Sequence, residues 1–161
     1  MSLFAQFFKF SKEQDAPVKK SISEHMEYLA SLRMPAVLMT KTEKQKFTKI
    51  GGLPDVPSDF VWPSWKHKPL SFLCQIDFSE IPPDFNNKDI PRTGFLYIFY
   101  DQDQSTWGFD PNDKDSWRLY YFEKMNIIRQ AEKPAGLDII YKEIRIKQTN
   151  IWTYPDWHED R

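Results

Sequence analysis

The segment from Gly51 to Pro69 limits the folds open to this chain more than any other stretch. Its prolines lack a backbone N–H and fix φ, so neither a helix nor a central strand can form there. There are four of them, Pro54, Pro57, Pro63 and Pro69, and aromatic residues lie between them. We therefore expect a rigid, extended loop that carries large rings. Gly51-Gly52 is not a phosphate-binding loop, because the prolines forbid a helix N-terminus directly after the glycines.

The composition is that of a folded protein of one-domain size, and we expect residues 1–161 to form a single domain. Aromatic residues make up 16% of the chain and the net charge is −1, which excludes a disordered tail. Lys and Arg (22) balance Asp and Glu (23), which excludes a globally basic nucleic-acid binder. The single cysteine, Cys74, excludes a disulfide framework and a multi-cysteine metal site.

Helices are expected near the N-terminus. Residues 3–12 place apolar side chains at helical spacing, which predicts a short amphipathic helix. It would dock onto the body of the protein or, alternatively, bind a partner. A second helix is expected from Ser21, where Ser21-Ile22-Ser23-Glu24 matches a capping box, to just before Pro35. Its buried stripe would be Ile22, Met26, Leu29 and Leu32.

Strands are expected in the rest of the chain. A short one covers 36–39, and residues 70–78 alternate so that Leu70, Phe72, Cys74, Ile76 and Phe78 would share the core face. Residues 94–100 are apolar on both faces and predict a central strand covered on both sides. Residues 117–122 would pair antiparallel with it. Residues 140–147 alternate with charged side chains and predict an edge strand.

These elements predict an α+β fold, with N-terminal helices packed on a mainly antiparallel sheet of roughly four to six strands. No stretch approaches the roughly 18 apolar residues that span a bilayer. The first ten residues lack the basic region and cleavage site of a secretory signal. With a lone thiol, this favours a cytoplasmic protein.

Several short motifs, in this order, resemble the YwqG-like family of bacterial proteins over residues 35–125. They are Gly51-Gly52-Leu53-Pro54, Trp62-Pro63, the strand Leu70 to Asp77, Pro91 with Gly94-Phe95-Leu96, and Trp107-Gly108-Phe109-Asp110 before Trp117-Arg118. The resemblance implies a soluble bacterial α+β protein with no established enzyme activity, matched here in its N-terminal part. Cys74 stands where the family often has a small residue, which implies a buried site. Some relatives accompany secreted toxin systems, so the resemblance also implies an immunity-type or other binding role.

Four tryptophans are the main candidate binding residues: Trp62, Trp65, Trp107 and Trp117. Exposed indoles mark partner-binding or sugar-binding surfaces. The alternative is that these rings cover the ends of a small sheet. Trp65, on the stiff proline-rich loop, is expected to be the most exposed.

Polar side chains supply a second set of candidates. Gln75 and Asp77 fall on one face of the predicted strand, about 6–7 Å apart. With Asp110 they could line the cleft of an enzyme that processes a small molecule or carbohydrate, one orienting the ligand and another accepting its proton. Alternatively, Gln75 and Asp77 bond to the backbone of the proline-rich loop.

Three further patterns carry weaker signals. Cys74 could act as a nucleophile with His25, His67 or His158, but its place on an apolar strand face favours a structural role. Asp101, Asp103 and Ser105 begin like a calcium loop, with further aspartates at 110, 113 and 115. Thr106 stands where such a loop needs glycine, and no Glu closes it. The run Lys41, Lys44, Lys46 and Lys49 is typical of a solvated edge.

The sequence thus favours a non-enzymatic binding module that contacts a protein partner through the proline-rich loop and the Trp107 turn. The alternative is the enzyme that uses Gln75, Asp77 and Asp110. We expect no cofactor, no metal, no nucleic acid and no membrane surface. The chain is expected to be a monomer or a weak homodimer formed through Phe4, Phe7 and Phe8.

Overall fold

The computed structural model describes residues 18–125 and 128–154. The chain divides into two compact units, Met1–Met34 with Trp152–Arg161, and Pro35–Ile151. The prediction of a single domain over the whole chain stays a prediction. The helix expected over residues 3–12, with Phe4, Phe7 and Phe8, lies outside the described residues. Among those described, no helix is long and apolar enough to cross a membrane.

The first unit contains the α-helix α1 (Val18–Ser31). It begins before the predicted start at Ser21 and ends, as predicted, ahead of Pro35. Of the expected buried stripe, the side chains of Met26 and Leu29 are exposed and Leu32 is only half-buried. The side chain of Ile22 lies outside what the structure describes.

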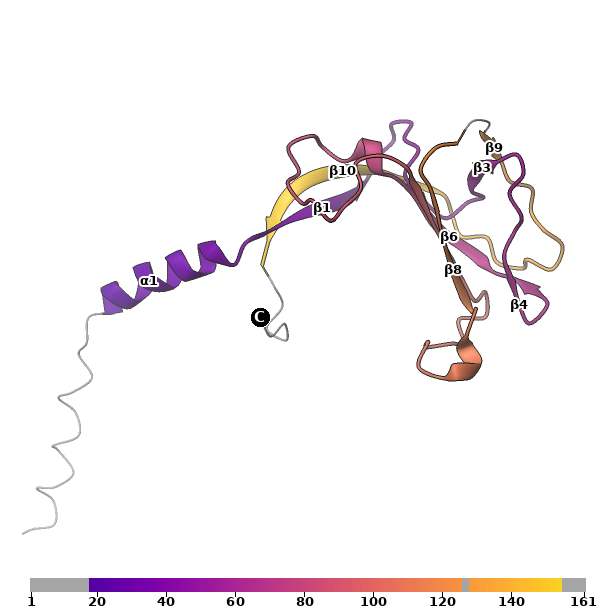
Figure 1. The fold of residues 1–161 in the computed structure, drawn as a ribbon, viewed down its shortest axis with the longest axis horizontal. Helices are drawn as coiled ribbons and strands as arrows, with labels where there is room; N and C mark the ends of the chain where they lie inside the picture. The colour runs from indigo at the N-terminus through magenta and orange to yellow at the C-terminus, as the bar shows by residue number, and fades with distance from the viewer. Residues whose placement is uncertain (1–17, 126–127, 155–161) are drawn as a thin grey trace, which may run out of the picture. The chain divides into compact units, whose positions relative to one another are not determined.

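The second unit is built on a six-stranded sheet whose strand order is β1-β10-β2-β6-β7-β8 (Figure 1). The pairs from β10 to β8 are all antiparallel. The strands are β1 (Met34–Lys41), β2 (Lys49–Ile50), β6 (Ser71–Asp77), β7 (Phe95–Tyr100), β8 (Trp117–Phe122) and β10 (Ile144–Thr153). The predicted strands at 36–39, 94–100 and 117–122 are therefore confirmed.

A thin second layer covers one face of this sheet. It consists of the pair β3 (Asp55–Pro57) and β9 (Ile128–Gln130) and of the hairpin β4 (Ser64–Trp65) and β5 (Lys68–Pro69). In Figure 1, β3 and β9 lie to one side of β6 and β8. The proline-rich segment, expected to be a loop, thus forms most of this layer.

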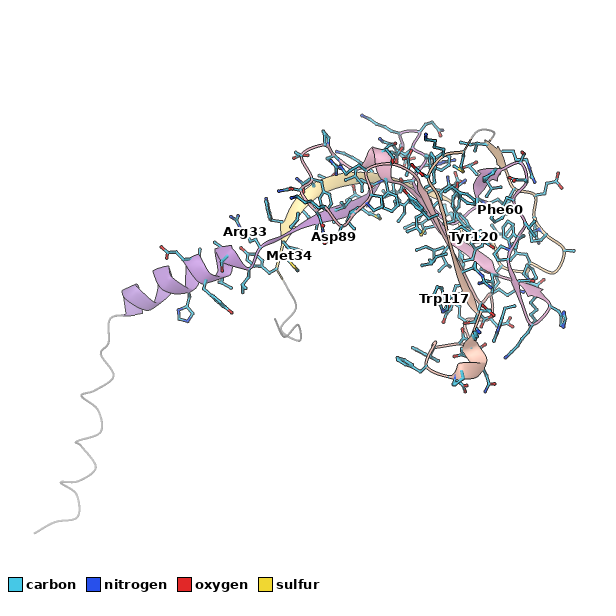
Figure 2. The ribbon with its side chains drawn as sticks, viewed as in Figure 1. Arg33, Met34, Phe60, Asp89, Trp117 and Tyr120 are labelled. Atoms are coloured by element: carbon cyan, nitrogen blue, oxygen red, sulfur yellow. The ribbon has the colours of Figure 1, made fainter. Side chains whose placement is uncertain are left out.

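The core lies between the sheet and the loop layer, and it is mainly aromatic. Its buried members are Val56, Leu70, Phe72, Tyr97, Phe99 and Ala131, and the rings of Phe60, Trp62, Trp65, Tyr120 and Phe122 pack against them. The Phe60 ring stacks on Phe99 at 5.8 Å between centroids and meets the edge of Tyr120 at 5.5 Å; Phe60 and Tyr120 lie together in Figure 2.

The predicted fold class is wrong. The fold is mainly antiparallel β, not α+β with N-terminal helices packed on a sheet, and the described residues hold a single α-helix. The physical reason is that the proline-rich loop supplies the apolar area that the helices were expected to supply. Aromatic side chains bury more area than any other type, so a few on a rigid loop complete a small core.

A bulge in β6 overturns the predicted faces of this strand. The register with β7 shifts between Phe72 and Cys74, so one extra residue, Leu73, changes the side on which later residues point. Phe72 faces the core, whereas Cys74 and Ile76 face the opposite side. Gln75, expected opposite the core, pairs with buried Tyr97 and is itself fully buried.

Two further strand predictions need correction. Strand β7 is internal, next to the edge strand β8, but it is covered on one face only, since Leu96, Ile98 and Tyr100 are merely half-buried. Strand β10 begins at Ile144, later than predicted, and lies between β1 and β2 instead of at an edge. Its charged residue Arg145 is accommodated there because its guanidinium forms an ion pair with Glu143 at 2.7 Å.

Candidate interaction surface

The face of the sheet that points away from the core is apolar across five strands. Directly opposed residues of an antiparallel pair point to the same side, so the registers identify its members. We call this surface the open face. Its apolar members are Ile144, Ile50, Cys74, Ile76, Leu96, Ile98, Tyr100, Trp117, Leu119 and Tyr121, and the same registers add one buried polar residue, Ser71.

The open face is most accessible at its β8 end. The exposed fractions of Trp117, Leu119 and Tyr121 are 50%, 49% and 49%. None of the side chains that define the open face is charged. A contiguous exposed apolar surface of this kind is uncommon on monomeric proteins and marks an interaction site.

The loop between β7 and β8 extends this surface with two more aromatic side chains. Trp107 is 83% exposed and Phe109 is 92% exposed. The hydroxyl of Tyr100, an open-face residue, donates to the carbonyl oxygen of Thr106, which holds the loop next to the open face. The carboxylate of Asp113 accepts from the N–H groups of Trp107 and Gly108, both at 3.1 Å. The loop tip is therefore an ordered turn that presents two rings.

At the other end of the open face lies an apolar pocket of about 270 Å³. Ile76 belongs to both. Val37, Met39, Phe78 and Phe85 are among the other apolar residues of its wall, which also includes the polar side chains of Asn87 and Gln148.

The proline-rich loop does not present its tryptophans as expected. Both Trp62 and Trp65 are half-buried and pack against the core. The indole N–H of Trp62 donates to the carbonyl oxygen of Leu70 at 2.8 Å, and the ammonium of Lys66 lies 3.9 Å from the centre of the Trp65 ring. The expectation that Trp65 is the most exposed of the four is wrong, because its ring is needed to complete the core. The most exposed of the four tryptophans is Trp107.

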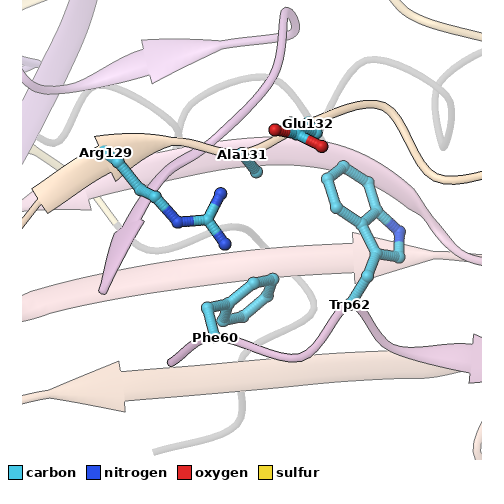
Figure 3. Close-up of a pocket in the computed structure, with 5 residues that line it drawn as sticks. All are labelled: Phe60, Trp62, Arg129, Ala131 and Glu132. Atoms are coloured by element: carbon cyan, nitrogen blue, oxygen red, sulfur yellow. The ribbon is translucent and has the colours of Figure 1, made fainter. Parts of the chain in front are cut away.

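A small pocket lies within the loop layer, between residues 60–62 and 129–132 (Figure 3). Its volume is about 260 Å³, and Phe60, Trp62, Arg129, Ala131 and Glu132 line it. The Arg129 guanidinium points toward the ring of Phe60. It also donates to the carbonyl oxygen of Ser58 over 3.5 Å. The Trp62 donor is already used within the protein, so this pocket offers a ligand ring faces, the Arg129 cation and the Glu132 carboxylate.

Gln75, Asp77 and Asp110, which were candidates for one cleft, each serve a separate structural role. The Gln75 amide bonds to the Asp55 N–H (2.8 Å), the Phe47 carbonyl (2.8 Å) and the Asp55 carboxylate (3.0 Å). Asp77 caps the 3-10 helix η2 (Phe78–Glu80) by accepting from Ser79, and Asp110 caps η3 (Pro111–Asp113) by accepting from Asn112. Gln75 thus fixes the proline-rich segment, as the structural alternative for this residue proposed.

Sequence reasoning missed a buried ion cluster centred on Lys49. This residue, expected on a solvated edge, is fully buried. Its ammonium contacts the Asp55 carboxylate at 2.8 Å, the Glu143 carboxylate at 3.1 Å and the Leu53 carbonyl at 2.7 Å. All three donors are therefore matched, and the cluster ties β2 to the loop layer.

The Cys74 thiol and the loop that begins at Asp101 both have structural roles. Burial raises the pKa of the Cys74 thiol to about 11, so it is protonated at neutral pH and is a poor nucleophile. Burial alone would raise the pKa of Asp101, but hydrogen bonds from Ser105 and Asp103 outweigh this and lower it. The Asp101 oxygens that a calcium ion would need already accept these bonds. The described residues contain no cluster of three or more side chains able to hold a metal ion.

The members of the open face could not be identified from the sequence. In β8, Trp117, Leu119 and Tyr121 alternate with Arg118, Tyr120 and Phe122, and both sets are rich in apolar groups. Only the loop layer, which covers the second set, decides which set is left exposed.

Comparison with known proteins identifies a family. No curated protein matches the chain at a significant level. A family described as a domain of unknown function (DUF1963) matches residues 48–159. That range includes β2, the loop layer, the β6–β8 sheet and β10. The chain therefore belongs to the DUF1963 family of domains of unknown function.

Proposed function

We propose that the chain is a YwqG-like member of this family and acts as a non-enzymatic protein-binding module. Its contact surface is the open face together with the Trp107–Phe109 loop tip. The observation that carries the proposal is an apolar sheet face that the protein itself leaves half-exposed at Trp117, Leu119 and Tyr121. Burial of such rings gives a large favourable free energy on association.

The chemistry of the surface favours a protein over other partners. The loop that borders it carries one lysine, Lys114, and five aspartates, at positions 101, 103, 110, 113 and 115. Lys68 pairs with Asp103 and Arg118 with Asp115, so an excess of negative charge remains. Negative charge at the rim repels phosphates, so nucleic acid and anionic lipid are poor partners. An apolar centre with a polar rim is the usual arrangement of a protein interface. The YwqG-like resemblance adds the expectation that the partner comes from a toxin system.

The hydrogen bonds of the structure disfavour the enzyme alternative. The polar groups that it would need, on Gln75, Asp77 and Asp110, are engaged in hydrogen bonds that hold the loop and two short helices. General acid–base work needs a group free to exchange its proton with a substrate.

The test begins with affinity capture from the native cell and continues with purified partners. Binding is measured for the wild type, for Ile98→Thr at the centre of the open face, and for the double variant Trp107→Ala, Phe109→Ala at the loop tip. The matched control is Val61→Ala, because Val61 is 79% exposed and lies in the proline-rich segment. We expect affinity to fall at least about tenfold for the first two changes and to stay unchanged for the control.

Two results would contradict the proposal. One is a set of purified partners that bind both surface variants as tightly as the wild type. The other is binding of the wild type to phosphatidylcholine vesicles that the loop-tip variant abolishes, which would make the surface a membrane site.

A further inference from the structure

Strand β8 ends the sheet, and half of its backbone points away from its neighbour β7. The N–H of Asp101 donates to the carbonyl oxygen of Ser116 at 2.7 Å. Residues opposed across an antiparallel pair alternate between hydrogen-bonded and non-hydrogen-bonded positions. Ser116 therefore occupies a hydrogen-bonded position, and every second residue after it in β8 does the same. The backbone groups of Arg118, Tyr120 and Phe122 thus bond to β7. The backbone groups of Trp117, Leu119 and Tyr121 point outward.

These outward groups have no hydrogen-bond partner among residues 18–125 and 128–154. The opposite edge strand, β1, carries Pro35, which cannot donate to an added strand, and ends at Lys41. Strand β8 has no proline. Its one charge, Arg118, is opposite Phe99 on the core side and bonds to Asp115 at 3.1 Å. The strand thus lacks the devices that normally protect an edge from pairing.

We propose that β8 pairs antiparallel with β8 of a second copy of this chain, about a two-fold axis that passes between the two Leu119 residues. Leu119 then faces Leu119 of the second copy, and Trp117 faces Tyr121 of the second copy. These are the residues whose backbone groups point outward, so all three N–H groups of each copy donate to carbonyl oxygens of the other. The two sheets become one.

The side chains favour this register over its neighbours. It places aromatic opposite aromatic and leucine opposite leucine on the open face, and such cross-strand pairs stabilise sheets. A shift by two residues in either direction would set Tyr121 against Asp115, or Trp117 against Glu123, and would leave outward groups unpaired. This self-complementarity is the reason to expect a second copy in place of an unrelated peptide strand.

This inference goes beyond the proposed function, because pairing uses the backbone edge and leaves the open face accessible on both copies. The two are therefore separable: Ile98→Thr should weaken partner binding yet leave the dimer intact.

The experiment measures the mass of the purified full chain by sedimentation velocity over a wide range of concentration. We expect the wild type to shift from one chain to two as concentration rises. Leu119→Lys and Leu119→Glu should each stay at the mass of one chain, because like charges would meet at the axis. An equimolar mixture of the two variants should form dimers again, since opposite charges then meet.

Matched controls are Ile50→Lys and Ile50→Glu, which place the same charges on the open face at a side chain of similar exposure, 44%, in the internal strand β2. They should dimerise like the wild type, and circular dichroism should show that all four variants keep the sheet. The proposal is overturned if the wild type stays at one chain at every concentration. It is equally overturned if the Leu119 variants dimerise alone, if their mixture does not, or if the Ile50 variants lose the dimer.

Discussion

At the scale of single residues, Lys49 shows that the place of a residue in the fold can determine its burial more strongly than its residue type. Lys41, Lys44, Lys46 and Lys49 look alike in the sequence, and a solvated edge was the natural prediction for all four. Strand β2 places only the last of them inside the sheet, where Asp55, Glu143 and the Leu53 carbonyl surround its ammonium. The acceptors come from segments far apart in the chain, so no local pattern announces them.

Replacing Lys49 by Met should destabilise the protein strongly. The change removes the cation that pairs with Asp55 and leaves Glu143 paired with Arg145 alone. Loss of one partner of a buried ion pair typically costs about 3–5 kcal/mol. The measurement is the free energy of unfolding in urea. The control is Lys41→Met, whose ammonium pairs at 2.8 Å with the exposed Glu43, and which should leave the urea midpoint unchanged. Equal effects of the two substitutions would show that the buried cluster has no stabilising role.

At the scale of elements, the sequence located most strands but not their faces. Alternation in residues 70–78 predicted the strand itself, and the apolar runs predicted β7 and β8 and their antiparallel pairing. The bulge at Leu73 then moved Cys74 and Ile76 out of the core and Gln75 into it. Because the side-chain period of a strand is two, a single extra residue reverses every later assignment. Nothing in Leu73 itself signals that insertion.

The turn after β2 depends on a glycine that lies against another segment. Gly51 has φ 70°, and a Cβ placed on it would lie 2.4 Å from the carbonyl oxygen of Lys142. Gly108 has φ 76° but no atom within 4 Å of such a Cβ. Alanine at either position therefore meets the same backbone penalty, about 1–2 kcal/mol. Only at Gly51 does a steric clash add to it.

We expect Gly51→Ala to lower the free energy of unfolding by about 1–3 kcal/mol more than Gly108→Ala, measured by urea denaturation of both variants. Should the two variants prove equally stable, the close approach of residues 51 and 142 would not be a real constraint on the fold.

At the scale of the whole molecule, the candidate surface exists because the loop layer covers only one side of the sheet. Both faces of β7 and β8 are apolar, so their sequences alone fit a strand covered on both sides. Which face is buried depends on residues 55–65 and 128–131, far away in the chain. The rigid aromatic loop was predictable from its prolines, but its role as the second layer of the core was not. The aromatic residues that remain exposed, Trp107, Phe109 and Trp117, follow from that arrangement.

If the loop layer and the sheet share one core, weakening the layer must weaken the sheet. Phe60 contacts Phe99, Tyr120 and Trp62, so Phe60→Ala should cost about 2–3 kcal/mol, near the lower end for a phenylalanine because its ring is half-buried. Its neighbour Val61 is exposed, and Val61→Ala should change stability by less than about 0.5 kcal/mol. Far-ultraviolet circular dichroism follows the sheet. Tryptophan fluorescence follows Trp62 and Trp65 in the layer when it is recorded in a background whose other four tryptophans are replaced by phenylalanine. For Phe60→Ala both signals should shift to the same lower urea midpoint. A fluorescence transition that moves while the sheet signal stays in place would mean that the layer unfolds by itself, and the open face would then not be the only apolar surface that the sheet can expose.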